Sequence, residues 1–383
     1  MTQVTGDWLD DTATQQVMAL LADAGKRAYF VGGCVRNALM QLPVADVDIA
    51  TDASPDQVMK LAQDAGLKVI PTGFEHGTVT VVTGGIPHEI TTFRKDVETD
   101  GRRAVVAYSN SIEEDARRRD FTMNALYADR DGVLIDPLGG LDDLENRCVR
   151  FIEDAGERIR EDYLRTLRFF RFHAWYGDPT GGLDSAALAA IAENLDGLEG
   201  LSKERVGSEV KKLLSAPDPA PAVAAMESTG VMARILPGAT SKFLAPLIHL
   251  EEGIVPDPIR RLVVLGGLGV KDCLRLSREE SKRLTMLRGL VGASGDIRAD
   301  GYQHGAQAAI DATLLRCAMM GQSLADNYQQ LAAEGAAMVF PVKASDLMPE
   351  LKGVELGETL RKLEGIWIAS SFKLTREQLL DRL

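Results

Sequence analysis

Segments with β-strand character occur only in the first 150 or so residues of this chain. They alternate with helical stretches at Thr12–Ala24 and Pro55–Ala65. The β-rich runs are Ala28–Val31, Val47–Ile49, Gly77–Val82, Ile90–Phe93, Ala125–Ala128 and Val133–Ile135. Beyond them, apolar residues recur at helical spacing. The pattern predicts an α+β domain followed by a part that is entirely helical.

The helical part is divided by turn signals. Its clearest amphipathic runs are Glu157–Trp175, Ser185–Asn194, Lys203–Leu214 and Pro221–Glu227. Proline pairs at 217/219 and 256/258 interrupt it, and the turn-rich segment Gly289–Gly301 separates two helical subdomains.

Composition bounds the class of protein. A chain of 383 residues with 45% hydrophobic content has material for two or three cores. It has no run of about 18 to 20 apolar residues, and its first residues are polar and acidic, so we expect a cytoplasmic protein without a membrane span. The four cysteines have no CxxC spacing, which gives no sign of a disulfide framework or a zinc site.

A net charge of −13 would ordinarily argue against a nucleic-acid partner, but it describes the whole chain and not its individual surfaces. Arginine is concentrated in a few places, so basic surfaces can exist within an acidic protein. These places are Arg102-Arg103, Arg117-Arg118-Arg119, Arg158–Arg171, Arg260-Arg261 and Lys282–Arg288.

The strongest chemical signal is a pair of carboxylates after a glycine turn. Gly32 and Gly33 follow a strand and open a helix, where backbone amides favour phosphate. Asp46 and Asp48 are two residues apart in an expected strand, so both project from one face. At about 5 to 6 Å they repel by about 3 kcal/mol at an effective dielectric near 20, a cost that a divalent cation removes.

Oxygen ligands of this kind suit Mg²⁺, and two such ions serve the attacking and leaving oxygens of a phosphoryl transfer. Glu89, on another expected strand, is a candidate third ligand. The structural alternatives are a solvated turn for the aspartate pair and an outward-facing strand residue for Glu89.

Five further segments restrict the choice of protein family. They are Arg118–Leu126, Glu161–Phe172, Leu201–Arg205, Asp346–Met348 and Leu356-Gly357. With the glycine turn and the carboxylates, they resemble the successive motifs of bacterial class II CCA tRNA nucleotidyltransferases and their poly(A) polymerase relatives, in the DNA polymerase beta nucleotidyltransferase superfamily. The resemblance spans nearly the whole chain. It implies a head with a small mixed sheet (residues 1–150), a helical neck that recognises the base (151–215), a helical body (216–295) and a helical, RNA-binding tail (296–383).

The resemblance also implies site roles. Asp46 and Asp48 would hold the metal, and the incoming nucleotide would contact Gly33, Arg36, Arg119, Asp162, Arg165, Arg168 and Arg171. The implied substrates are CTP, ATP and tRNA, with Mg²⁺ as cofactor, and no protein partner is indicated. The chain departs from the family pattern at Asn37, where an acidic residue is usual, and at Leu39-Met40-Gln41 in place of Leu-Leu-Gly. Without that carboxylate, Arg36 loses an expected ion-pair partner.

Residue chemistry supports the role of the neck. Asp162 and Arg165 can present a hydrogen-bond acceptor beside a donor. Cytosine and adenine each offer an amino donor beside a ring-nitrogen acceptor, whereas uracil and guanine offer a carbonyl beside an N–H. One protein pair therefore accepts C and A and rejects U and G. The alternative for the arginines at 165, 168 and 171 is a solvated basic face of an amphipathic helix.

Adding both C and A requires a movable element. The polar segment Lys95–Ser109, which contains Asp100-Gly101-Arg102-Arg103, has the length of a loop, and family members that add only C lack such a loop. We therefore expect template-independent CCA addition to tRNA. The alternatives are a poly(A) polymerase or an A-only-adding enzyme, although the chain lacks a basic tail, and a non-catalytic RNA-binding protein on the same scaffold.

Overall fold

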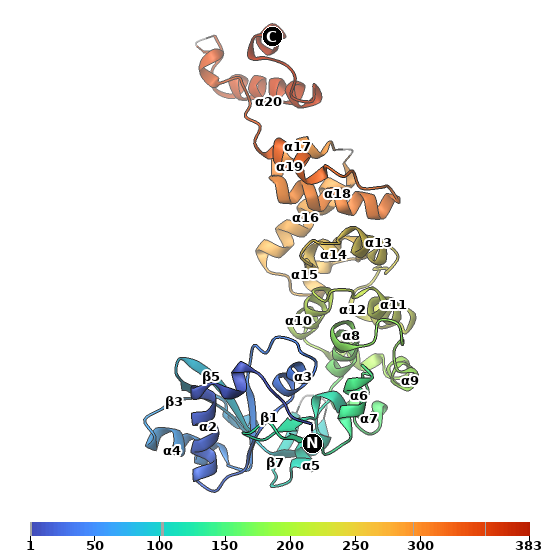
Figure 1. Ribbon diagram of the computed structural model, residues 1–383. Coiled ribbons are helices and arrows are strands. Elements are labelled where there is room, and N and C mark those ends of the chain that lie inside the picture. The colour runs from blue at the N-terminus through green and yellow to red at the C-terminus, as the bar shows by residue number, and fades with distance from the viewer. Residues whose placement is uncertain (1, 101–102, 294, 349) are drawn as a thin grey trace. The chain divides into compact units, whose positions relative to one another are not determined.

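The computed structural model describes residues 2–100, 103–293, 295–348 and 350–383 (Figure 1). The chain forms two compact units, Met1–Pro237 and Gly238–Leu383. The four-part division into head, neck, body and tail is finer than this and stays a prediction. Within the described residues, no helix has the length and apolar character needed to cross a membrane.

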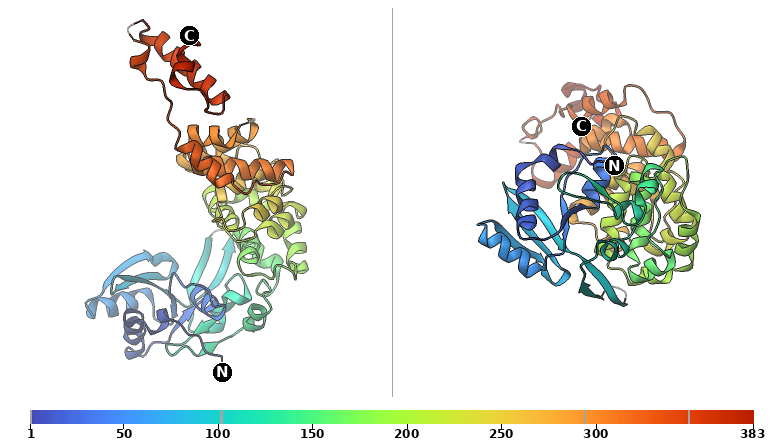
Figure 2. Two further views of the ribbon diagram at one scale, coloured as in Figure 1. Left: turned by 45° about the horizontal axis from the view of Figure 1, so that its top comes forward. Right: turned by 60° about the horizontal axis from the view of Figure 1, so that its bottom comes forward.

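The head of the first unit is built on a seven-stranded mixed sheet of order β3-β4-β5-β2-β1-β8-β9. The pairing of β2 with β5 is parallel and the other pairings are antiparallel. The strands are β1 (Ala28–Val31), β2 (Asp48–Thr51), β3 (Lys68–Gly73), β4 (Thr78–Thr83), β5 (Ile86–Thr92), β8 (Tyr127–Ala128) and β9 (Leu134–Ile135). The predicted α+β class is confirmed, and Figure 2 shows the strands confined to the blue-to-teal part of the ribbon. The sequence analysis missed β3, an edge strand whose side chains are largely exposed.

Helices α2 and α4 pack against this sheet and against each other (Figure 1). Each begins at a side-chain cap: Asp11 accepts hydrogen bonds from two backbone amides of α2, and Ser54 forms a capping box at α4. Paired residues of β2 and β5, Ile49 and Ile90, are fully buried. The head helices are α1 (Asp7–Asp10), α2 (Thr12–Asp23), α3 (Gly33–Leu39), α4 (Pro55–Asp64), η1 (Phe74–His76), α5 (Ile112–Arg117), η2 (Thr122–Asn124) and α6 (Gly140–Glu145).

The segment predicted as a loop, Lys95–Ser109, is instead mostly a two-stranded antiparallel ribbon. It consists of β6 (Arg94–Asp100) and β7 (Arg103–Tyr108), with a register shift between Asp96 and Glu98. The prediction was wrong because polarity says little about backbone pairing: two antiparallel strands satisfy each other's N–H and C=O groups whatever their side chains. Gly101 and Arg102 lie outside the described residues.

The remainder of the first unit is helical. Its elements are α7 (Ala155–Glu161), α8 (Leu164–Tyr176), α9 (Ser185–Glu193), η3 (Asp196–Gly200), α10 (Lys203–Leu214), α11 (Ala220–Ser228) and α12 (Val231–Ile235). The single run predicted over Glu157–Trp175 is two helices, because Asp162 is extended, with φ −152° and ψ 103°. Its carboxylate accepts the Leu164 N–H (3.1 Å) and its carbonyl accepts the Arg165 N–H (2.9 Å). Asp162 therefore ends one helix and supports the start of the next.

The second unit is helical in its described residues. Its elements are α13 (Leu244–Leu250), α14 (Pro258–Leu265), α15 (Val270–Cys273), α16 (Arg278–Gly292), α17 (Ile297–His304), α18 (Ala306–Met320), α19 (Tyr328–Ala336), η4 (Ala344–Asp346), α20 (Gly353–Ala369) and α21 (Arg376–Leu380). A buried ion cluster joins its helices: Arg260 donates to Glu251 (2.6 Å) and to Asp311 (2.9 Å), and Arg283 donates to Asp311 (2.7 Å). The Arg260 and Asp311 side chains are each only 1% exposed.

Candidate active site

The predicted carboxylates lie around the start of β2. Asp48 is the first residue of β2 and stands in register with Glu89 of the parallel neighbour β5. Asp46 is exposed and precedes the strand rather than belonging to it, whereas Val47 and Ile49 are buried. Asp46 therefore lies just outside the strand that was expected to carry both carboxylates, and strand pairing brings Glu89 next to Asp48.

The charge environment of Asp48 suits a cation. Burial raises its pKa to about 6, and the nearby Glu89 and Asp46 carboxylates act in the same direction, against the opposing effect of Arg119. Such crowding is relieved when a divalent ion takes up the charge. Among the described residues, no three His, Cys, Asp or Glu side chains gather closely enough to enclose a metal by themselves. Mg²⁺ binds through one or two carboxylates together with substrate phosphates.

The glycine turn depends on Gly32, which the sequence analysis did not include among the site residues. Gly32 has φ +70°, and a Cβ there would lie 3.4 Å from Nη1 of Arg119. Gly33 starts α3, and a Cβ there would lie 3.9 Å from Nη2 of Arg36. The turn thus carries the chain close to Arg119 before α3 begins.

Arg36 is 5% exposed and is held by residues of both the head and the helical segment that follows it. Its guanidinium donates to the Tyr176 hydroxyl (2.9 Å) and to the Asn124 side-chain oxygen (2.8 Å). The Asn37 oxygen also accepts from it, at 2.9 and 3.2 Å. The amide oxygen of Asn37 therefore orients Arg36 where the family usually has a carboxylate.

A buried carboxylate links the head to the neck. Asp120 accepts from Nε of Arg168 (2.7 Å) and from the Asn124 amide (3.1 Å). Burial disfavours its charge, but Arg168 outweighs burial and the pKa of Asp120 falls to about 2. Because Asn124 also binds Arg36, these side chains form one continuous network.

Arg119 is fixed within the head. It donates to Asp115 (3.0 Å) and to the Tyr127 hydroxyl (3.1 Å), while that hydroxyl donates to Asp115 (2.7 Å). Arg119 follows the end of α5 and precedes the 3-10 turn η2. This triangle sets the direction of a guanidinium that lies near the Asp48 carboxylate.

The predicted base-recognition pair retains hydrogen-bonding capacity. Asp162 accepts a 2.6 Å bond from Arg205. Arg165 donates to the carbonyls of Arg158 (2.9 Å) and Arg118 (3.1 Å) and pairs with Glu161. A carboxylate has about four acceptor sites and a guanidinium five N–H groups, so these described contacts leave room for a base.

Four of the predicted nucleotide-binding residues, Arg119, Asp162, Arg165 and Arg168, line one cavity of about 360 Å³. The full lining is Arg94, Arg118, Arg119, Asp120, Asn124, Asp162, Leu164, Arg165, Arg168 and Arg205. Six arginines line it against two aspartates, and with Asp115 and Glu161, which pair with lining arginines, the formal charge is still +2 in a chain of net charge −13. The predicted basic surface is therefore present. Sequence reasoning did not single out Arg94, Arg118, Asn124 and Arg205 as contacts, although Arg118, Asn124 and Arg205 lie inside the quoted motifs.

The other predicted nucleotide contacts, Gly33, Arg36 and Arg171, do not line this cavity. Arg171 instead pairs with Glu209 of α10, at 2.6 Å. It lines a different cavity, near the ends of α8 and α10. Residues three apart on a helix are offset by about 60°, so Arg168 and Arg171 lie beside each other on α8 and both contact the Phe172 ring, yet they line different cavities.

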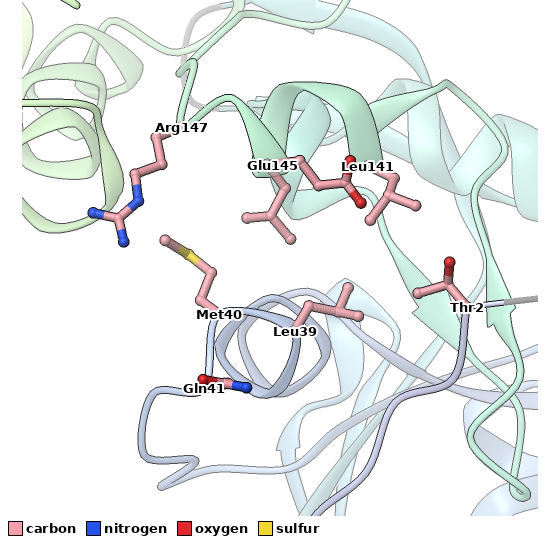
Figure 3. Close-up of a pocket in the computed structure, with 8 residues that line it drawn as sticks. Thr2, Leu39, Met40, Gln41, Leu141, Glu145 and Arg147 are labelled. Atoms are coloured by element: carbon pink, nitrogen blue, oxygen red, sulfur yellow. The ribbon is translucent and has the colours of Figure 1, made fainter.

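A further cavity of about 330 Å³ lies between the end of α3 and α6 (Figure 3). Met40 and Arg147 face one another across it, with Leu39 and Leu141 beside them. None of the predicted site residues lines it. Its mixture of apolar side chains with one Glu and one Arg distinguishes it from the arginine-rich cavity.

Two protein-family models match parts of the chain. The poly A polymerase head domain matches residues 28–150. The probable RNA and SrmB-binding site of polymerase A matches residues 182–243.

Similar proteins cover far more of its length. The CCA tRNA nucleotidyltransferase 1, mitochondrial, of Mus musculus is 33% identical over 94% of this chain and 87% of the relative. The CCA-adding enzyme of Geobacillus kaustophilus (strain HTA426) is 33% identical over 90% of this chain and 86% of the relative. Among solved structures, the Bacillus stearothermophilus CCA-adding enzyme in complex with CTP superimposes with a TM-score of 0.77, at 26% identity over 99% of this chain and 98% of that one. This chain therefore belongs to the family of CCA-adding tRNA nucleotidyltransferases.

Proposed function

We propose that this protein transfers CMP and AMP from CTP and ATP to the 3′ end of tRNA, building or repairing the CCA terminus without a template. The observation that carries the proposal is the cavity in which Asp162 and Arg165 meet Arg119 and Arg168. It combines groups for reading a base edge with groups for holding phosphates. Membership of the family over nearly the whole length of the chain supports the same activity.

Enzymes of this family use divalent metal, and for this chain we propose Mg²⁺. Asp46 and Asp48 would hold it, with Glu89 as a further ligand. Burial, and after it the nearby Glu89 and Asp46 carboxylates, raise the pKa of Asp48, and this crowding of negative charge supports that assignment. When bound, the metal would neutralise phosphate charge and activate the attacking oxygen. The proposed location is the cytoplasm.

The side chains of the cavity have separate tasks in this proposal. Arg119 and Arg168 are held by Asp115 and Asp120, so their guanidinium groups are oriented before phosphate arrives. Asp162 and Arg165 select cytosine or adenine. Gly33, Arg36 and Arg171 stay predicted nucleotide contacts, and the bonds of Arg36 to Asn124 and Tyr176 support at least a role in positioning.

The proposal is tested with tRNA that lacks its last three nucleotides, in the presence of Mg²⁺. We expect two C residues with CTP alone and one further A when ATP is added. Long A tails would favour poly(A) polymerase, and a single A without C would favour an A-adding enzyme. Binding of tRNA and nucleotide with no extension would favour a non-catalytic RNA-binding protein.

Base selection has its own test. In Asp162→Ala the acceptor beside Arg165 is lost, so we expect the preference for CTP over UTP to fall at least about tenfold. The measurement is kcat/KM for each of the four nucleotides. Glu204→Ala, an exposed position on α10, serves as control. An unchanged preference in Asp162→Ala would remove this residue from base recognition.

A further inference from the structure

A second basic cavity, of about 340 Å³, lies at the C-terminal ends of α8 and α10. Its lining residues are Arg171, Trp175, Tyr176, Lys211, Lys212 and Ser215. All six lie in the part of the chain that the structure describes, and none of them is acidic. Three of the lining residues, Arg171, Lys211 and Lys212, are cations, and Arg171 pairs with the buried Glu209 of α10. This charge favours an anionic ligand in a protein that is acidic overall.

Trp175 gives this cavity an aromatic wall. Its side chain is 41% exposed, unusual for so large an apolar group. The indole N–H donates to the Lys212 carbonyl at 2.8 Å, which fixes the ring against α10. An immobilised, exposed indole between cations is the arrangement on which single-stranded nucleic acids stack their bases.

The buried Phe172 ring is contacted by one arginine from each basic cavity. The guanidinium of Arg168, from the first cavity, lies 5.4 Å from the Phe172 ring centroid, and that of Arg171, from the second, lies 4.8 Å away. Tyr176, in the second cavity, also holds Arg36 of the head. Arg168 and Trp175 are seven residues apart, which puts them on one face of α8 about 10 Å from each other. That distance corresponds to about three stacked nucleotides.

We propose that this second cavity binds the single-stranded 3′ end of the RNA primer, with a base stacked on Trp175 and phosphodiesters held by Lys211 and Lys212. The proposal rests on the proposed function, because it needs an RNA strand that ends at the first cavity. An incoming nucleoside triphosphate fits less well. It carries Mg²⁺, and no lining residue of the second cavity is a carboxylate that would share the ion.

The test measures binding of tRNA that lacks CCA to the full-length protein, by fluorescence anisotropy and without nucleotide. Trp175→Ala should raise Kd about tenfold, and Trp175→Phe should restore most of the affinity because it keeps an aromatic face. Lys211→Ala/Lys212→Ala should also weaken binding and should lower the slope of log Kd against log salt by about 1.4, or about 0.7 per lost phosphate contact. Trp175→Ala should leave that slope unchanged.

Lys60→Ala, at an exposed position of α4, is the matched control and should bind like the wild type. In steady-state assays the KM for the RNA primer should rise in the Trp175 and Lys211/Lys212 variants, with kcat and the KM for CTP unchanged. Equal primer Kd in wild type and both variants, with melting temperatures preserved, would overturn the proposal. A rise in the KM for CTP alone would also overturn it, because the cavity would then serve the incoming nucleotide.

The two proposals fail separately. If the wild type extends no RNA but its binding depends on Trp175, the proposed function falls and the RNA site stands. If the wild type builds CCA normally and the variants do so with the same primer KM, only the RNA site falls.

Discussion

Two carboxylates of the head show how neighbours decide the state of a side chain. Burial and the nearby Glu89 raise the pKa of Asp48 to about 6. Asp120 is also buried, yet its pKa is held at about 2 because Arg168 outweighs burial. The first environment favours a bound cation, whereas the second already contains its counter-charge. We therefore expect Asp48 to serve the reaction and Asp120 to serve the architecture of the site.

Removing either proposed metal ligand should abolish activity but not folding. In Asp46→Ala and in Asp48→Ala we expect nucleotide addition to fall about a thousandfold, because transition-state charge is no longer neutralised. The measurement is the rate of CTP incorporation into tRNA lacking CCA, with circular dichroism to verify the fold. Asp64→Asn, exposed at the end of α4, is the control. Near-normal rates in both variants would refute the metal assignment.

Asp120 predicts a pH dependence of stability. Its folded pKa of about 2 is below the unfolded value of about 3.9, so it contributes stability that is fully present above about pH 4 and is lost as the pH falls through about 2. Asp120→Asn should lower the free energy of unfolding by about 2 to 3 kcal/mol at pH 7. The further loss between pH 4 and pH 2 should be smaller than in wild type. Urea unfolding at several pH values checks this, and an unchanged pH dependence would contradict it.

Among the structural elements, the β6–β7 ribbon differs most from expectation. It leaves the sheet after β5 and returns to it, since the Ser109 N–H donates to the Phe93 carbonyl at 2.8 Å. At its base, Arg94 lines the cavity proposed to bind the nucleotide. Because the ribbon is anchored at its base, it can move relative to the cavity as one unit. It therefore suits the role of the movable element that addition of C and then A requires.

Deleting Val97–Arg103 should therefore leave C addition intact and abolish A addition. The reason is that the cavity would keep its base-reading residues but lose the element that adapts it to adenine. The measurement is product length on tRNA ending in CC and on tRNA lacking CCA. As a control, the Gly84–Gly85 turn of the β4–β5 hairpin is lengthened by two glycines. Normal A addition by the deletion variant would refute the hypothesis that the ribbon is needed for adding A.

The whole molecule consists of two compact units with separate means of stabilisation. The proposed chemistry lies in Met1–Pro237, so nucleotide binding stabilises that unit. Gly238–Leu383 contains the buried cluster of Arg260, Glu251 and Asp311. Removing one member of such a cluster leaves a buried charge uncompensated.

Calorimetry should accordingly show that the two units respond independently. Asp311→Ala should destabilise the second unit by about 3 kcal/mol, because Arg260 and Arg283 each lose one carboxylate partner and keep only Glu251 and Asp257, respectively, as ion-pair partners among the described residues. A saturating concentration of CTP with Mg²⁺, near 100 times its Kd, should stabilise the first unit by about 2.7 kcal/mol. Asp326→Ala, at an exposed position, is the control. If the protein unfolds in a single transition whose temperature shifts both with Asp311→Ala and with CTP, the two units are not independent.

Much of this protein could be predicted from local sequence. Strand and helix periodicity gave the α+β class, six of the seven strands of the main sheet and the helical character of the rest, because side-chain alternation is a local property. The carboxylate spacing pointed to Asp46 and Asp48, and the family resemblance implied Arg119, Asp162, Arg165 and Arg168 as further candidates. The limits of local reasoning appear in the missed edge strand β3 and in the ribbon, since backbone pairing leaves little trace in polar side chains.

The tertiary structure decided which of the candidate site residues come into contact. Asp120 and Arg168 are 48 positions apart, and Asp48 and Glu89 come together only through the register of two parallel strands. Arg171 belongs to the same sequence motif as Arg168, yet α8 turns it towards a different cavity. Sequence spacing specifies chemistry within one turn or one strand, whereas contacts between distant segments depend on how the sheet and the helices pack.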